Sequence, residues 1–102
     1  MKFLALEQPI PGVADAAFTP ELLRAEAARA WVLHQAGLVR ELWFRGDRHE
    51  AVLVIECEGA AAAKAALDSL PLVAHGLIRF ELVPLVPYPG FERLFAEGWQ
   101  GT

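Results

Sequence analysis

Two side chains in one predicted helix, Glu26 and His34, have the chemistry needed to move protons. Residues 20–37 follow helical periodicity, and on an apolar face centred on Leu23, Glu26 falls inside the apolar arc and His34 near its centre line. A carboxylate and an imidazole on the sheet-facing side of a helix can reach a pocket between helix and sheet. Burial raises the pKa of a glutamate, which suits a general base or acid. We therefore take Glu26 and His34 as candidate catalytic residues.

Both residues also have a structural interpretation. Glu26 can sit at the edge of the apolar arc in contact with water, as most glutamates do. His34 lies in the last turn of the predicted helix, where an imidazole can hydrogen-bond carbonyl groups and interact favourably with the helix dipole. The environment of Glu26 is the observation that separates these interpretations.

Large aromatic residues occur near this helix and the strand that follows it. Trp31, Trp43 and Phe44 can line an apolar pocket that contains one or two polar groups, the usual form of a small-molecule site. Packing in the core or at a subunit interface is the alternative. On the first interpretation, Trp31 and Trp43 are predicted to bind substrate.

Arg45, Arg79 and Tyr88 complete the set of predicted substrate-binding residues. The two arginines lie on predicted strands, and a guanidinium can hold an anionic substrate through paired hydrogen bonds. The alternative is that both arginines form ion pairs with glutamates on the same strand faces. Tyr88 lies in the proline-rich C-terminal segment.

The histidines and the cysteine do not form a metal-binding pattern. His34, His49 and His75 are not closely spaced, and the chain has no His-x-x-x-His or Cys-x-x-Cys pair. It also lacks a glycine-rich phosphate loop and a serine nucleophile elbow. Cys57, at the end of a predicted strand, is interpreted as a small core residue. We expect no metal and no cofactor.

Six predicted elements must position these side chains. Thr19 is a good N-cap, with Pro20 at the first helical position, and Gly37 is suited to end the first helix. Pro71 is expected to end the second, alanine-rich helix. In chain order the elements are a strand at 3–7, a helix at 20–37, a hairpin of strands at 38–45 and 51–57, a helix at 59–70 and a strand at 77–86.

This order predicts an α+β protein with the ferredoxin-like βαββαβ fold, in which a four-stranded antiparallel sheet carries two helices on one face. The other sheet face is also apolar, and monomers avoid large exposed apolar patches. We therefore expect a second copy to pack sheet against sheet, giving a dimeric α+β barrel. Residues 1–102 are predicted to form a single domain, with 84–102 as an extended C-terminal tail that either folds back or reaches the partner.

The composition narrows the choice of partners. Hydrophobic residues make up 55% of the chain and charged residues 22%, which is more apolar than a typical soluble domain and favours at least a homodimer. The net charge is −4 and no basic stripe follows any element, so nucleic acid is not expected. No apolar run reaches the roughly 18 residues of a membrane span. The single cysteine fits a reducing cytoplasm.

Several segments resemble the muconolactone isomerase family. The resemblance covers roughly residues 20–89 and includes Arg40-Glu41-Leu42-Trp43, the following apolar strand, and Leu70-Pro71-Leu72 leading into the last strand and its proline tail. It implies a cofactor-free isomerisation, in which a base removes a proton beside a lactone carbonyl and the proton returns elsewhere on the conjugated system. Glu26 falls near an acidic position of the family's first helix, so the resemblance implies that it shuttles the proton.

Three functions follow from these observations. The first is proton-transfer isomerisation of a lactone or related small apolar acid. The second is a cofactor-free monooxygenase of the same barrel superfamily, with His34, Trp43 and Arg45 around an aromatic substrate. The third is a non-catalytic ligand-binding or assembly module. A carboxylate in a cavity favours the first, an aromatic cavity without one the second, and a packed interior the third.

Overall fold

The computed structural model describes residues 1–96, whose strands and main helices follow the order βαββαβ. In chain order the elements are β1 (Lys2–Pro9), η1 (Asp15–Ala17), α1 (Pro20–Gln35), β2 (Val39–Phe44), β3 (Ala51–Glu56), α2 (Ala60–Asp68), α3 (Pro71–Ala74), β4 (Ile78–Leu85) and η2 (Gly90–Phe95). The last part of the predicted tail, residues 97–102, lies outside the described residues.

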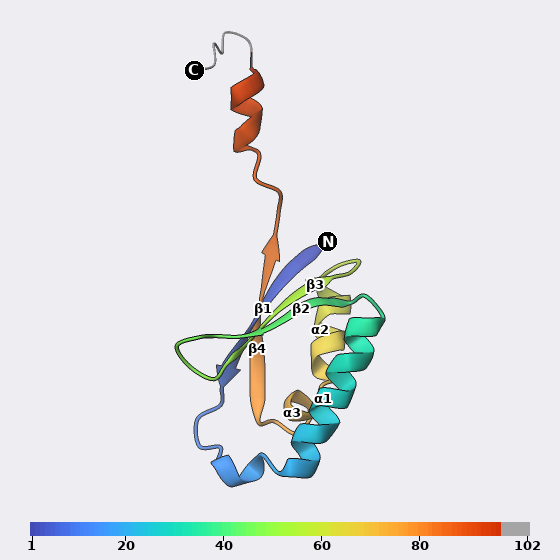
Figure 1. Ribbon diagram of the computed structural model, residues 1–102, viewed down its shortest axis with the longest axis vertical. Coiled ribbons are helices and arrows are strands. Elements are labelled where there is room, and N and C mark those ends of the chain that lie inside the picture. Colours follow the sequence, from blue (N-terminus) through green and yellow to red (C-terminus); the bar gives the residue numbers. More distant parts are fainter. Residues whose placement is uncertain (97–102) are drawn as a thin grey trace.

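The four strands form one antiparallel sheet in the order β2-β3-β1-β4. The two most apolar strands, β1 and β3, are therefore central, because each pairs on both sides. The helices lie together on one side of this sheet (Figure 1). The predicted ferredoxin-like α+β fold is confirmed.

Helix α1 begins at the predicted Pro20 and ends at Gln35, two residues before the predicted end at Gly37. The Thr19 hydroxyl accepts a hydrogen bond from the Leu22 N–H at 3.2 Å, which satisfies one of the unpaired donors of the first turn. At the other end Gly37 adopts a φ of +80°, and the Leu38 N–H donates to the Leu33 carbonyl at 3.1 Å. This left-handed glycine turns the chain directly into β2.

Helix α2 packs closely on the sheet because its buried positions are small. Ala63 is fully buried, and Ala66 and Leu67 are nearly so. Pro71 was expected only to end this helix, but it also begins the short helix α3, which was not predicted. Leu70 is extended because a residue before proline is disfavoured in the helical region, and Pro71 then occupies the first position of a new turn.

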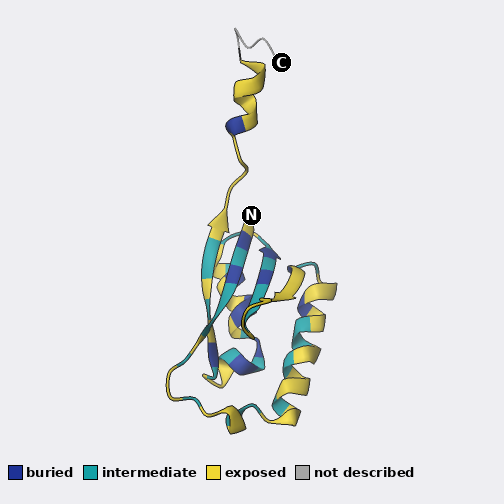
Figure 2. Ribbon diagram, turned by 60° about the vertical axis from the view of Figure 1, so that its left-hand side comes forward, coloured by how far each residue is buried: buried dark blue, intermediate teal, exposed yellow. Residues whose placement is uncertain are grey.

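The hydrophobic core lies between the helices and one sheet face. Phe3, Val39 and Ile55 are its largest fully buried side chains. Alternate residues of the central strands, such as Leu4 and Val54, point to the opposite face, where they remain partly exposed. Within residues 1–96 no element covers that face (Figure 2).

After β4 the chain leaves the sheet and extends away from it, so the described molecule measures 62 Å along its longest axis (Figure 1). In this segment the rings of Tyr88 and Phe91 meet edge to face, with centroids 5.1 Å apart. Gly90 lies beneath the Tyr88 ring, at a position where a Cβ would overlap that ring. The segment therefore has local packing of its own although it stands clear of the sheet.

Candidate functional site

A cavity of about 560 Å³ lies between α1 and the helix-facing side of the sheet. Its walls are mainly apolar and come from α1, from β2 and β3, and from the ends of β1 and β4. Leu33, Leu53 and Leu72 are among the buried side chains that line it. A volume of this size suits a small organic molecule.

The side of α1 that packs on the sheet differs from the predicted one. Leu33 is the buried residue of this helix, and Leu22 and Glu26 are partly buried. Leu23, which was predicted at the centre of the buried face, is 46% exposed and borders the cavity. The buried face of α1 is therefore turned about the helix axis relative to the predicted face, so that Leu23 lines the cavity and does not pack in the core.

Glu26 is half-buried and lines the cavity. Its Oε1 accepts a hydrogen bond from the Leu72 N–H at 2.9 Å, an unpaired donor in the first turn of α3. Burial raises the pKa of Glu26 because it disfavours the carboxylate. The Leu72 N–H opposes this shift, and the negative charge of Glu7 adds to it. Glu26 thus holds its proton to a higher pH than an exposed glutamate.

Glu7, which was not predicted as a site residue, is a second carboxylate in the cavity wall. Its Oε1 accepts a hydrogen bond from the Ala51 N–H at 3.0 Å, which ties the end of β1 to the start of β3. The signal that would have found it is strand alternation. Glu7 shares a face with Phe3 and Ala5, which are buried under the helices.

His34 lines the cavity from the last turn of α1. Its Nδ1 lies 2.8 Å from the Val39 carbonyl, so Nδ1 carries the hydrogen and donates it. In the neutral ring Nε2 is then an acceptor. His34 therefore makes the carbonyl hydrogen bond of the structural interpretation and also lines the cavity. The Trp31 ring lies 6.0 Å from the imidazole, centroid to centroid.

Aromatic residues surround the cavity and are themselves largely exposed. Trp31, Trp43 and Phe44 each expose about 60% of their surface and line the cavity. The Phe44 ring stacks on His49 at 4.3 Å, and His49 is a lining residue that was not predicted. Trp43 pairs with Val52 and therefore directs its side chain to the opposite sheet face, where its Nε1 donates to Glu41 at 2.9 Å.

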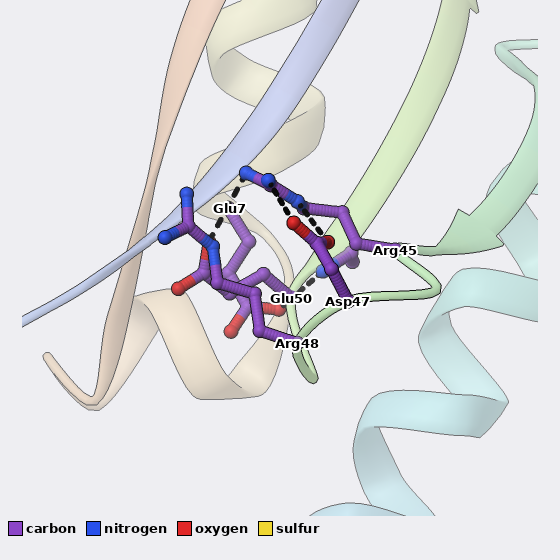
Figure 3. A network of polar contacts seen from close by, with 6 residues as sticks. Glu7, Arg45, Asp47, Arg48 and Glu50 are labelled. Carbon is purple, nitrogen blue, oxygen red and sulfur yellow. Dashed lines mark hydrogen bonds and ion pairs between the residues drawn. The ribbon is translucent and has the colours of Figure 1, made fainter.

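Arg45 does not line the cavity, because it is held in an ion-pair network at the β2–β3 hairpin (Figure 3). Two guanidinium nitrogens donate to the Asp47 carboxylate, at 2.8 and 2.6 Å. This contact lowers the pKa of Asp47 to about 2. Glu50 lies 3.1 Å from Arg48 and 4.0 Å from Arg45. Arg45 thus forms ion pairs at the hairpin, which was the alternative to substrate binding.

Arg79 and Tyr88 also lie away from the cavity beside α1. Arg79 borders a second cavity of about 460 Å³, formed by α2, α3 and β4, in which Lys64 is paired with Asp68 at 2.5 Å. Tyr88 lies in the extended segment after β4. The structure thus brings Glu26, Trp31 and His34 to one cavity, without Arg45, Arg79 and Tyr88. Trp43 also borders this cavity, although its pairing with Val52 places its side chain on the opposite sheet face.

Two further properties concern residues 1–96 only. In this part of the chain, no three His, Cys, Asp or Glu side chains are grouped so that they could hold a metal ion. The same residues include no helix long and apolar enough to cross a membrane.

The fold of the chain is that of a known enzyme. A crystal structure of muconolactone isomerase superimposes with a TM-score of 0.68, covering 87% of this chain and 92% of that chain at 23% identity. No family model and no curated protein sequence matches the chain. The resemblance noted in the sequence is therefore confirmed at the level of the fold, which is muconolactone isomerase-like.

Proposed function

We propose that the chain is a cofactor-free isomerase that moves a proton on a lactone or a related small apolar acid. The observation that carries this proposal is the Glu26 carboxyl group in the wall of an apolar cavity, where burial raises its pKa. A base with a raised pKa transfers protons more effectively near neutral pH than an ordinary glutamate does. The muconolactone isomerase-like fold supports the same reaction class.

The reaction needs one proton donor and acceptor. Glu26 as a carboxylate takes a proton from the carbon beside the lactone carbonyl, and the electron pair of that C–H bond spreads into the conjugated carbonyl system. The resulting carboxylic acid returns the proton to a distant carbon of the same system. One proton leaves and one returns, so the reaction needs no oxidant or reductant.

The surroundings of Glu26 prepare it for this task. The Leu72 N–H fixes Oε1, which leaves Oε2 to exchange the proton. The His34 ring, held by its contact with the Val39 carbonyl, presents Nε2 as an acceptor for a polar group of the substrate. Trp31 supplies an apolar surface for the ring of the substrate.

The open sheet face supports the further proposal of a homodimer. Leu4, Leu6, Val52, Val54 and Val83 lie on this face and are partly exposed. Burial of apolar surface is the main favourable term in association, so a second copy packed on this face would be stabilised. Light scattering at micromolar concentration should give twice the chain mass. We assign the protein to the cytoplasm because its single cysteine, Cys57, is free.

The two alternatives have less support. A monooxygenase would bind its substrate against the aromatic residues of the cavity, but this function has no role for the Glu26 carboxyl group. An assembly module would have a packed interior in place of a cavity of about 560 Å³. The carboxyl group in the cavity therefore favours the isomerase.

The test is the turnover of a panel of butenolides by the wild type and by Glu26→Gln, followed through the change in ultraviolet absorbance as conjugation changes. Glutamine can still accept the Leu72 N–H, so the fold should be retained while the base is lost. We expect the rate to fall by about 10²–10⁴. Glu58→Gln, an exposed position outside the cavity, is the matched control and should keep the wild-type rate. Equal rates in the wild type and Glu26→Gln would contradict the mechanism.

A further inference from the structure

The cavity has an uneven charge distribution, which bears on the kind of ligand that fits. Its two acidic side chains come from opposite walls, Glu7 from β1 and Glu26 from α1. Within residues 1–96, no lysine or arginine is among the residues that line it. A ligand carboxylate in this space would meet negative charge without a counter-ion.

Two arginines that adjoin lining residues in the β2–β3 hairpin already have partners. Arg45 is bound to Asp47, and Arg48 lies 3.1 Å from Glu50 (Figure 3). Turning either guanidinium toward the cavity would break these contacts and leave an acidic partner unpaired. The proposed dimer contact lies on the opposite sheet face.

The two carboxyl groups are fixed in place. Each uses Oε1 to accept one backbone N–H, from Ala51 for Glu7 and from Leu72 for Glu26. Neither group can move away from a ligand without leaving a backbone donor unpaired. The negative charge of Glu7 also acts on Glu26, since it contributes to the raised pKa of Glu26.

We propose that Glu7 determines specificity in this cavity by selecting uncharged carbonyl compounds and rejecting those that carry a carboxylate. This inference rests on the proposed function, from which it takes the ligand class, a lactone. It narrows that class to the uncharged members and so excludes the related acids that the proposed function also allows. Two unit charges at short range in a partly dehydrated site repel strongly, whereas an ester or lactone carbonyl loses little on entering an apolar space. Glu7 therefore acts through charge, and Glu26 handles the proton.

The test compares two ligands that differ by one charge, a carboxymethyl-substituted butenolide and its methyl ester. Calorimetry gives both affinities without any need for turnover. We expect the wild type to bind the ester at least about tenfold more tightly than the acid. Tighter or equal binding of the acid would overturn the inference, and so would binding of neither compound.

Three variants separate charge from shape. Glu7→Gln keeps the acceptor for the Ala51 N–H and removes the charge, so the preference for the ester should narrow severalfold. Glu7→Asp keeps the charge and should keep the preference, and Glu58→Gln should match the wild type. An unchanged preference in Glu7→Gln would remove Glu7 from this role. If the wild type prefers the ester but does not isomerise it, the proposed function fails and the inference stands.

Discussion

The two long helices cover the same sheet face in different ways. Helix α2 brings three small or medium side chains, Ala63, Ala66 and Leu67, into the core. Helix α1 is longer but buries only Leu33, and the space beside it is the cavity with Glu26. Close packing contributes stability, whereas the looser contact of α1 provides room for a ligand and partly shields the Glu26 carboxyl group from water.

The largest difference should appear when the same substitution is made in both helices. Ala63→Leu adds volume at a fully buried site and should lower the free energy of unfolding by about 1–3 kcal/mol. Ala27→Leu, at an exposed position that lines the cavity, should change it by less than about 0.5 kcal/mol and weaken ligand binding severalfold. Thermal denaturation and ligand titration measure the two effects. Equal destabilisation by both substitutions would contradict the comparison.

A smaller effect concerns pH. Folding raises the pKa of Glu26 above 4.5, so between the two values the folded chain binds more protons than the unfolded chain. The contribution of this group to stability is therefore fully present below pH 4.5 and is lost as the pH rises through the folded pKa. Glu26→Gln lacks this titration. Its melting temperature relative to the wild type should rise with pH across this window, and a constant difference would show that Glu26 has an ordinary pKa.

The smallest effect is expected at the hairpin. Arg45→Gln removes the contact that lowers the pKa of Asp47, but both groups are accessible to water, where ion pairs contribute little. Because Arg45 does not line the cavity, ligand affinity should equal that of the wild type. Titration of the ester against this variant checks the expectation. A marked loss of affinity would show that Arg45 contributes to ligand binding and would contradict this expectation.

The fold could be predicted because its signals are local. Thr19 and Gly37 mark the ends of α1 through capping chemistry, and the apolar character of β1 and β3 fixes them at the centre of the sheet. Helix α3 was missed because Pro71 serves both to end one helix and to begin another.

The candidate site was harder to predict. Helical periodicity placed Glu26 and His34 on a common side of α1. It could not show which side of the helix lines a cavity and which side packs in the core. Glu7 belongs to a strand and reaches the cavity through sheet register, a long-range property. Arg45 was predicted to bind substrate because a sequence does not reveal that its guanidinium is already paired with Asp47.

Proton exchange on a bound ligand tests the central claim most directly. The methyl ester of the carboxymethyl butenolide is incubated in D₂O with the wild type or Glu26→Gln, and deuterium entering the carbon beside the lactone carbonyl is followed by NMR. Because Glu26 is only half-buried, the proton that it takes exchanges with D₂O before it is returned to the ligand. The account therefore predicts rapid exchange with the wild type and a rate close to that of buffer alone with Glu26→Gln. Equal exchange with both proteins, or none above buffer with the wild type, would contradict it.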